Sequence, residues 1–337
     1  MWGMQNHEHF SHAQSRLPKR TVDGIVLLDK PTGISSSAAL TRVRGMYRAL
    51  KGGHTGALDP LASGLLPICL GESAKFSSFF LEGRKKYRAT GKLGIVTTTA
   101  DAEGEVVVKR EVGDAAQRLE ECIGSFVGVI TQIPPIYSAI KVGGKPLYKY
   151  ARKGRADEVE IPSREIEIYS ITLLEKTEDS FTVEVYCSKG TYIRTLIADI
   201  GEALGCGAYV TMLRRIAVEG LPEGQMTGLE DLQKMVDDNE NPEDFSKLDA
   251  LLYPLDKAMS WLPSVSLPEN IAKPLVHGVR QTASDIVACA EFKDCGIHSE
   301  DPMQILCGGQ FLGVGHFSKG VLIPDRIMTD PFKELKR

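Results

Sequence analysis

The stretch that most constrains this chain spans residues 52–64 and reads GGHTGALDPLASG. Its glycines permit positive φ angles and let another molecule come close to the backbone. Pro60 fixes its own φ and disfavours the helical region for Asp59, so we predict an extended aspartate with its carboxylate turned outward. The apolar run at 65–70 predicts a buried strand that anchors the loop. An Asp-Pro pair also starts ordinary turns, and on these residues alone that interpretation stays open.

Length and composition predict two domains of the soluble globular class. A chain of 337 residues exceeds one ordinary compact domain. No apolar run approaches the ~18 residues that a membrane-spanning helix needs. The polar segment 1–20 lacks the apolar stretch of a secretory signal, and we expect it to be disordered. Seven cysteines without a C-x-x-C pair suit reduced thiols, so we expect a cytoplasmic protein.

Potential metal ligands gather near the C-terminus. They are Cys289, Cys295, His298 and Cys307. Their spacing fits none of the usual zinc-binding patterns. The three histidines within 1–20 carry no metal prediction either. We therefore expect a protein without a bound metal.

The charges are segregated along the chain, although the net charge is only −4. One basic run without acids spans 84–92, and a second spans 141–155, where tyrosines are interleaved. Acidic residues gather instead around 230–244. Segregated charge with interleaved aromatic residues is typical of a polyanion-binding face. A basic run is also a common solvated surface, so either run alone indicates little.

Hydrophobic periodicity predicts a mixed α/β chain. Strands are expected near 24–29, 65–70, 86–94, 165–174, 181–186 and 208–218. Helices are expected after the serines at 35–37, near 72–80, and after Thr191, which would be a helix cap. From about residue 264 the pattern changes to short strands separated by glycines, which indicates a small β-barrel module.

Two features in this pattern suggest function. Arg194 lies in the first turn of a predicted helix and off its apolar stripe. A cation there opposes the helix dipole, so it should have an anionic partner unless it simply faces solvent. The segment 132–155 is basic, contains tyrosines, and is interrupted by Pro134-Pro135 and Gly143-Gly144, so that no periodicity survives. We expect a mobile loop that becomes ordered on a partner.

Several motifs together resemble the bacterial tRNA pseudouridine synthases of the TruB type. The motif GHTGALDP at 53–60 is joined, in the family's order, by DKP at 29–31, KYR at 86–88, QIPPIYSA at 132–139, KGTYIR at 189–194 and LRR at 213–215. The resemblance covers about 21–255. Residues 263–330 resemble, less specifically, a PUA domain, which is an RNA-binding pseudobarrel. The segment 282–302 looks extra relative to a compact PUA barrel.

The resemblance implies an α+β fold, in which a mixed, mainly antiparallel sheet flanked by helices forms the catalytic domain at 21–255. It implies an enzyme that isomerises uridine 55 in the T-loop of tRNA to pseudouridine after base flipping, and that also assists tRNA folding. Substrate and product are isomers, so no cofactor is required. A carboxylate can attack or stabilise the glycosidic carbon, as in glycoside hydrolysis. The resemblance gives this role to Asp59, kept ionised by an ion pair with Arg194.

The resemblance also implies a pocket for the flipped base. Tyr87 would stack on the uracil and lie near the proton on C5, and Tyr192 and Leu213 would line the pocket. His54 would help to fill the gap that the nucleotide leaves in its stack. Without the family, Tyr87 and Leu213 would be read as ordinary core residues.

Support and partners follow from the same resemblance. Lys30 and Pro31 would support the pocket from behind. The loop 132–155 would grip the T-loop of tRNA, which is recognised by shape and backbone charge. No exposed apolar stripe calls for a second subunit, so we expect a monomer without an obligate protein partner and without membrane contact.

Two other functions are compatible with parts of the sequence. An RNA-binding or RNA-folding protein could use the basic loop and the C-terminal module without any chemistry. A nucleoside or glycoside hydrolase could use a lone aspartate, but the loop offers no second carboxylate and the basic faces would be unnecessary. Replacing Asp59 by asparagine separates the first alternative from the synthase, because only the enzyme requires the carboxylate.

Overall fold

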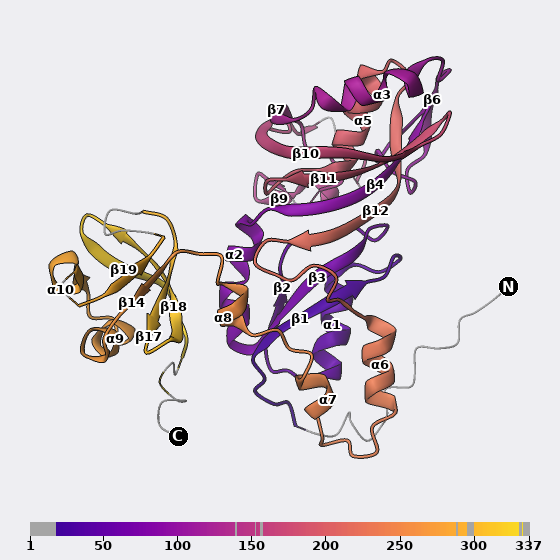
Figure 1. Cartoon of the computed structure of the whole chain (residues 1–337). Helices are drawn as coiled ribbons and strands as arrows, with labels where there is room; N and C mark the ends of the chain where they lie inside the picture. Colours follow the sequence, from indigo (N-terminus) through magenta and orange to yellow (C-terminus); the bar gives the residue numbers. More distant parts are fainter. Residues whose placement is uncertain are drawn as a thin grey trace.

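Two β-sheets dominate the computed structural model, which describes residues 18–138, 140–151, 153–155, 158–287, 289–294, 300–329 and 332. The large sheet has nine strands, and the small sheet, nearer the C-terminus, has six (Figure 1). The predicted α+β class is confirmed: a mainly antiparallel sheet with helices is followed by a curled β module. Within the described ranges, no helix has the length and apolar character needed to cross a membrane.

The large sheet runs in the order β13-β1-β3-β12-β4-β11-β10-β7, with β2 paired to β3. Its strands are β1 (Gly24–Lys30), β2 (Gly52–His54), β3 (Ser63–Leu70), β4 (Lys85–Leu93), β7 (Gly128–Gln132), β10 (Arg164–Lys176), β11 (Ser180–Cys187), β12 (Ala208–Val218) and β13 (Thr227–Gly228). Only β1–β13 and β3–β12 pair in parallel. The six strands predicted before residue 220 are therefore confirmed.

Five helices of the described ranges share one hydrophobic core with the large sheet. They are α1 (Ser36–Met46), α3 (Ala115–Gly124), α5 (Ile193–Ala203), α6 (Leu229–Asp237) and α7 (Ser246–Asp249). Helix α1 begins as predicted, because the Ser35 side chain accepts a hydrogen bond from Ala38 N–H at 3.1 Å. The predicted cap of α5 is wrong. Tyr192 is its N-cap residue, and the Thr191 hydroxyl donates to the Ser188 carbonyl instead.

A second core joins the two sheets behind β1 and β3. It includes side chains from η2 (Gly71–Phe76), α2 (Ser77–Glu82) and α8 (Leu255–Ala258), together with Phe311 and Val314 of the small sheet. The rings of Phe76 and Phe311 meet edge to face, with centroids 5.5 Å apart. The carboxylate of Glu72 accepts a hydrogen bond from Thr329 N–H at 2.8 Å. The small sheet is thus seated on the large one by apolar and polar contacts.

The small sheet runs in the order β15-β19-β18-β17-β14-β16. Its strands are β14 (Ser264–Ser266), β15 (Gln281–Thr282), β16 (Glu291–Lys293), β17 (Met303–Cys307), β18 (Gln310–Ser318) and β19 (Val321–Ile327). The same part of the chain contains the helices α9 (Glu269–Val276) and α10 (Ala283–Val287). The described part of 282–302 supplies α10 and the edge strand β16. Cys295 and His298, considered above as metal ligands, lie outside the described residues, as do residues 1–17.

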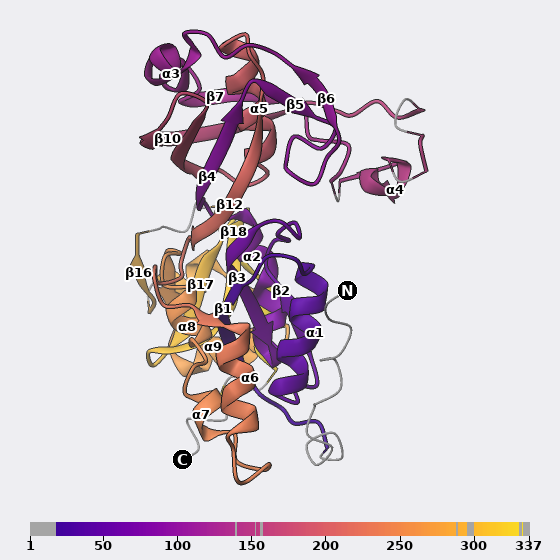
Figure 2. The same ribbon diagram turned by 90° about the vertical axis from the view of Figure 1, so that its right-hand side faces the viewer.

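The segment 132–155 contains regular structure, contrary to the prediction. A hairpin of β8 (Lys141–Val142) and β9 (Lys145–Pro146) leads into α4 (Leu147–Ala151). Figure 2 shows this segment standing out from the large sheet on the side of β5 (Ile95–Thr97) and β6 (Val106–Lys109). Strands of two residues and a helix of about one turn are too short to produce a periodic pattern, so the sequence could not reveal them.

The close approach of β3 and β12 depends on Gly64. This glycine has φ +98°, and a Cβ there would lie 2.2 Å from the Arg215 carbonyl oxygen.

We expect Gly64→Ala to lower the free energy of unfolding by roughly 2–4 kcal/mol, because it combines a strained φ with separation of the strands. Chemical denaturation measures the loss. Gly33→Ala is the control, since Gly33 has φ +83° with nothing within 4 Å of its Cβ position. If both variants lost the same free energy of unfolding, the strained φ alone would explain the loss, and separation of β3 from β12 would not contribute.

Candidate functional site

Hydrogen bonds from two other segments fix the loop between β2 and β3. The Ser36 hydroxyl at the start of α1 donates to the Leu58 carbonyl at 3.0 Å and accepts from Leu58 N–H at 2.8 Å. The Pro60 carbonyl accepts from Gly33 N–H at 2.8 Å. Asp59 is therefore presented by a loop whose backbone is held on both sides of it.

The Arg194 guanidinium lies between two carboxylates. Its Nη2 is 3.0 Å from Asp59 Oδ2, and its Nη1 is 3.3 Å from Asp101 Oδ2. The same nitrogens donate to the carbonyls of Tyr137 and Thr99, each at 2.9 Å. The side chains of Arg194 and Asp101 are 4% exposed, whereas that of Asp59 is 43% exposed. Asp59 is thus the member of this ion-pair group that a ligand can reach.

Asp101 is a member of this ion-pair group that the sequence did not reveal. It follows β5 in a turn, where its Oδ1 accepts hydrogen bonds from the Thr99 hydroxyl and from Glu103 N–H. An aspartate in a turn-rich segment is ordinarily read as a turn former. Only the tertiary contact with Arg194 distinguishes it, and no local sequence signal could have found it.

The pKa of the Asp59 carboxyl is raised above its ordinary 3.8. Burial by the surrounding protein is the largest cause, even though one edge of the side chain reaches solvent. The positive charge of Arg194 acts in the opposite direction, and the negative charge of Asp101 adds to the rise. The arginine therefore favours the ionised carboxylate, as expected, but does not fully offset the loss of water.

A cavity of about 140 Å³ opens beside Asp59. The loop, two strands and the start of α5 supply its lining: Ala57, Leu58, Asp59, Ala62, Tyr87, Ser138, Thr191, Tyr192, Ile193, Arg194 and Leu213. The structure thus brings together five of the residues singled out in the sequence, namely Asp59, Tyr87, Tyr192, Arg194 and Leu213. The lining combines one carboxylate with apolar walls and two phenol rings, which suits a flat, partly polar ring.

Both phenols in the lining have raised pKa values because they are buried. For Tyr87 the charge of Arg215 opposes this rise, and for Tyr192 the nearby Ser138 hydroxyl and the charge of Arg164 do so. The backbone of Tyr192 is fixed by Gln132, whose side chain accepts from Tyr192 N–H at 2.8 Å and donates to its carbonyl at 3.0 Å. Both rings are therefore neutral hydroxyl groups near pH 7.

His54, Lys30 and Pro31 lie beside the cavity and not in its lining. His54 is half-buried at the end of β2, and burial lowers its pKa, with Arg215 adding to the effect. Lys30 is fully buried and donates to the carbonyls of Pro31 and Ile34, each at 2.8 Å. Burial lowers the pKa of Lys30 to about 8, against the opposing charge of Asp59. Lys30 thus ties the turn after β1 together.

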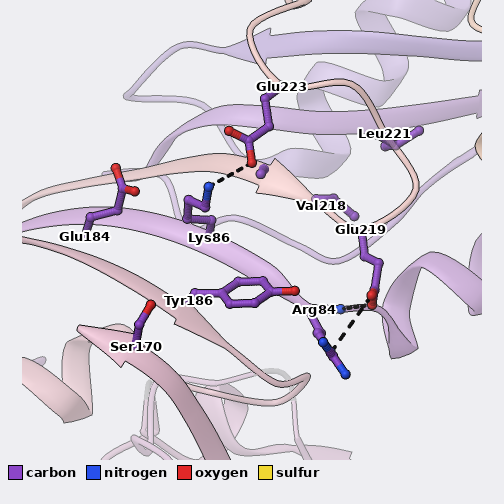
Figure 3. Close-up of a pocket in the computed structure, with 10 residues that line it drawn as sticks. Arg84, Lys86, Ser170, Glu184, Tyr186, Val218, Glu219, Leu221 and Glu223 are labelled. Atoms are coloured by element: carbon purple, nitrogen blue, oxygen red, sulfur yellow. Dashed lines mark hydrogen bonds and ion pairs between the residues drawn. The ribbon is translucent and has the colours of Figure 1, made fainter. Parts of the chain in front are cut away.

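The basic run at 84–92 does not form a free cationic face. Four of its cations are in ion pairs, namely Arg84–Glu219, Lys86–Glu223, Arg88–Glu184 and Lys92–Asp179. Lys85 is buried and donates to two backbone carbonyls. Arg84 and Lys86 line a hollow of about 470 Å³ (Figure 3). Because successive residues of a strand point to opposite faces, this hollow lies on the face of the sheet opposite Tyr87. The acids come from other strands and turns, so the run alone could not show them.

The lysines of 141–155 are different. Lys141, Lys145, Lys149 and Lys153 are exposed, and no carboxylate of the described ranges lies within ion-pair distance of them. Arg155 pairs with Glu158. This protruding segment is therefore the stronger candidate for contact with a polyanion.

The described residues contain no group of three or more His, Cys, Asp or Glu side chains placed to hold a metal ion. The site offers a carboxylate pair, a guanidinium and two phenols. These groups can provide charge stabilisation, nucleophilic attack and proton transfer.

Comparison with known proteins gave consistent matches. The description "TruB family pseudouridylate synthase (N terminal domain)" matches residues 44–193, and "tRNA pseudouridylate synthase B C-terminal domain" matches 194–260. The tRNA pseudouridine synthase B of Vibrio vulnificus is 46% identical over 318 residues, covering 92% of this chain and 96% of the relative. That of Shewanella amazonensis is 43% identical over 319 residues, covering 93% and 97%. A solved Cbf5-Nop10-Gar1 complex contains a chain of similar fold, with TM-score 0.70, 24% identity, and coverage of 90% of this chain and 84% of that chain.

Proposed function

The chain belongs to the TruB family of pseudouridine synthases, isomerases that act on uridine in tRNA, and from this we propose that its target is uridine 55 in the T-loop, with Asp59 as the catalytic carboxylate. The observation that carries the proposal is the placement of Asp59. It is held by a buried arginine at the mouth of a small cavity that suits a flat ring. The remaining steps follow from the chemistry of the isomerisation.

The reaction exchanges a C–N glycosidic bond for a C–C bond. The flipped uridine places its base in the cavity. As the C1′–N1 bond breaks, its electron pair leaves on uracil N1, and Asp59 attacks or stabilises C1′. The base turns, C5 bonds to C1′, and the carboxylate is released. The Tyr87 hydroxyl gives up its own proton to solvent, its oxygen then takes the C5 proton, and N1 takes up a proton from solvent, so the product is an isomer and no cofactor is consumed.

The ion-pair group suits the charge that develops at the sugar. Two carboxylates and one guanidinium carry a net charge of about −1, which complements a positive C1′ in the transition state. Arg194 orients the Asp59 carboxylate through Nη2, and Asp101 holds Arg194 from its other side. Tyr192 and Leu213 hold the base, and Lys30, Pro31 and His54 support the pocket.

RNA binding is assigned to the parts outside the cavity. The exposed lysines of 141–155 would contact the backbone of the T-loop, as a protruding cationic segment can. Residues 263–330 would act as a PUA-like RNA-binding domain beside the catalytic domain at 21–255. The protein would act as a cytoplasmic monomer without an obligate protein partner. Since this segment can hold RNA without chemistry, a second role in tRNA folding is also proposed.

Tritium release tests the proposed reaction and its target together. A tRNA transcript labelled with tritium at uracil C5 is incubated with wild-type protein, beside a transcript that carries cytidine at position 55. We expect about one equivalent of tritium from the first transcript and none from the second. Equal release from both would overturn the choice of uridine 55. Binding of tRNA without release would overturn the catalytic proposal and favour the folding role.

The raised pKa of Asp59 predicts where activity fails in acid. Only the ionised carboxylate can act, so activity is present above the folded-state pKa and is lost as the pH falls through it. We expect the midpoint of this loss to lie above 3.8, the ordinary value for aspartate. Single-turnover rates from pH 3.5 to 8, with tRNA binding measured at each pH, provide the test. A midpoint at or below 3.8 would show that Arg194 outweighs burial.

A further inference from the structure

Arg215 is a buried cation at the back of the site. Its exposure is 1%, and among the described residues no carboxylate lies within ion-pair distance of it. Its Nε donates to the Leu65 carbonyl at 2.7 Å, and its Nη2 donates to the Gly56 carbonyl at 3.1 Å. Burial of a guanidinium without an anionic partner costs free energy, so its retention calls for a compensating role.

Arg215 lies directly opposite Tyr87. The two residues are cross-strand partners in the antiparallel pair of β12 and β4, so their side chains leave the sheet on the same face. The Arg215 guanidinium is near enough to the Tyr87 hydroxyl to favour the ionised form of the phenol. Its positive charge is also the main influence that opposes the rise in the Tyr87 pKa caused by burial.

The same guanidinium reaches the loop that carries Asp59. Gly56 lies three residues before Asp59 and has φ +75°. A Cβ at this position would lie 3.3 Å from Arg215 Nη1, so the close contact leaves little room for a side chain. One arginine therefore joins β12 to the Asp59 loop and lies across from Tyr87 on the same face of the sheet.

We propose that Arg215 is a positioning residue for removal of the C5 proton. It holds the Tyr87 hydroxyl at a fixed position relative to the Asp59 loop and stabilises the phenolate that takes this proton. The inference rests on the proposed role of Tyr87. In this step the C5–H bond breaks and its electron pair forms the C5=C6 bond. The N1=C6 pair moves to N1, which takes a proton from solvent. The Tyr87 hydroxyl first loses its own proton to solvent. The phenolate then takes the C5 proton, which restores the hydroxyl, and that proton later exchanges with solvent.

The test compares Arg215→Gln and Arg215→Lys with Arg214→Gln. Arg214 is a matched control, because it is the neighbouring arginine, points to the other face of β12, and binds Asp29 at 2.9 and 2.7 Å. Single-turnover pseudouridine formation is measured across pH on tRNA with hydrogen or deuterium at C5 of the target uridine. Melting temperature and tRNA affinity are measured for each variant.

Arg215→Gln is expected to slow the reaction roughly 10- to 100-fold, while tRNA affinity stays within about two-fold. The C5-deuterium isotope effect should exceed that of wild type, because proton removal becomes the slower step. The rise of the rate with pH should move to higher pH, since loss of the cation raises the Tyr87 pKa. Arg215→Lys keeps the positive charge but loses the planar guanidinium with its several N–H donors. Its isotope effect should therefore rise, while its pH profile stays near that of wild type.

The inference is overturned if the folded variants lose activity with the isotope effect and pH profile of wild type, or if Arg214→Gln changes both in the same way. Should Arg215→Gln fail to fold, an unchanged isotope effect in Arg215→Lys overturns it equally. Wild-type protein that forms no pseudouridine would instead defeat the proposed function, so the two failures are distinct.

Discussion

Asp59→Asn is expected to abolish pseudouridine formation, with a loss of about 10⁴-fold or more in the single-turnover rate. The amide has nearly the same shape and can still accept a hydrogen bond from Arg194. It has no negative charge to stabilise C1′ and no carboxylate oxygen to attack it. Because Arg194 keeps its ion pair with Asp101, we expect the fold to survive the substitution.

Tritium release and tRNA binding are measured side by side for this variant. The control is Asp179→Asn, which removes an exposed carboxylate that pairs with Lys92 on the surface. That control should keep the wild-type rate, since exposed ion pairs contribute at most about 1 kcal/mol to stability. If Asp59→Asn retained more than about 1% of the rate with intact binding, the catalytic role of the carboxylate would be wrong.

Arg194→Gln should produce the largest combined loss of stability and activity. It leaves two carboxylates facing each other without the cation between them, and removal of one partner from a buried ion pair costs about 3–5 kcal/mol. The pKa of Asp59 should rise further, because Arg194 lowers it and Asp101 raises it. We therefore expect the acid limb of activity to move to higher pH and the neutral rate to fall about 100-fold or more.

A double-mutant cycle with Asp101→Asn separates this explanation from simple loss of packing. Removal of the second carboxylate from the Arg194→Gln background should restore part of the free energy of unfolding, because the repulsion is relieved. It should also move the acid limb back toward lower pH. Strict additivity of the two substitutions would contradict the arrangement described here.

The sequence predicted the strands and the loop of the site because their signals are local. The alternation and apolar runs that define β1, β3, β4 and β12 lie within short windows. The position of Arg194 in a first helical turn predicted either an anionic partner or a solvent-facing side chain, and the structure shows the first, with Asp59 and Asp101 as partners. The need for a partner was visible in one segment, whereas the identity of the second partner was not.

What the sequence missed depends on neighbours that are distant along the chain. The cations at 84–92 look free until strand pairing and the turns beside the strands bring Glu184 and Glu219 next to them. Thr191 looks like a helix cap, but its hydroxyl is already bonded to Ser188. The same limit applies to Arg215, because its position opposite Tyr87 follows from the register of β12 and β4, which a single sequence does not encode visibly.

The core that contains Phe76 and Phe311 fixes the small sheet in position relative to the large sheet. A domain on a flexible tether raises only the local concentration of its ligand, and it can hold that ligand at many distances. A domain seated on a common core keeps one distance between its own surface and Asp59. If an RNA contacted both the small sheet and the cavity beside Asp59, the fixed distance between them would have to match the length of its stem. Stem length would then help to select the nucleotide that enters the cavity.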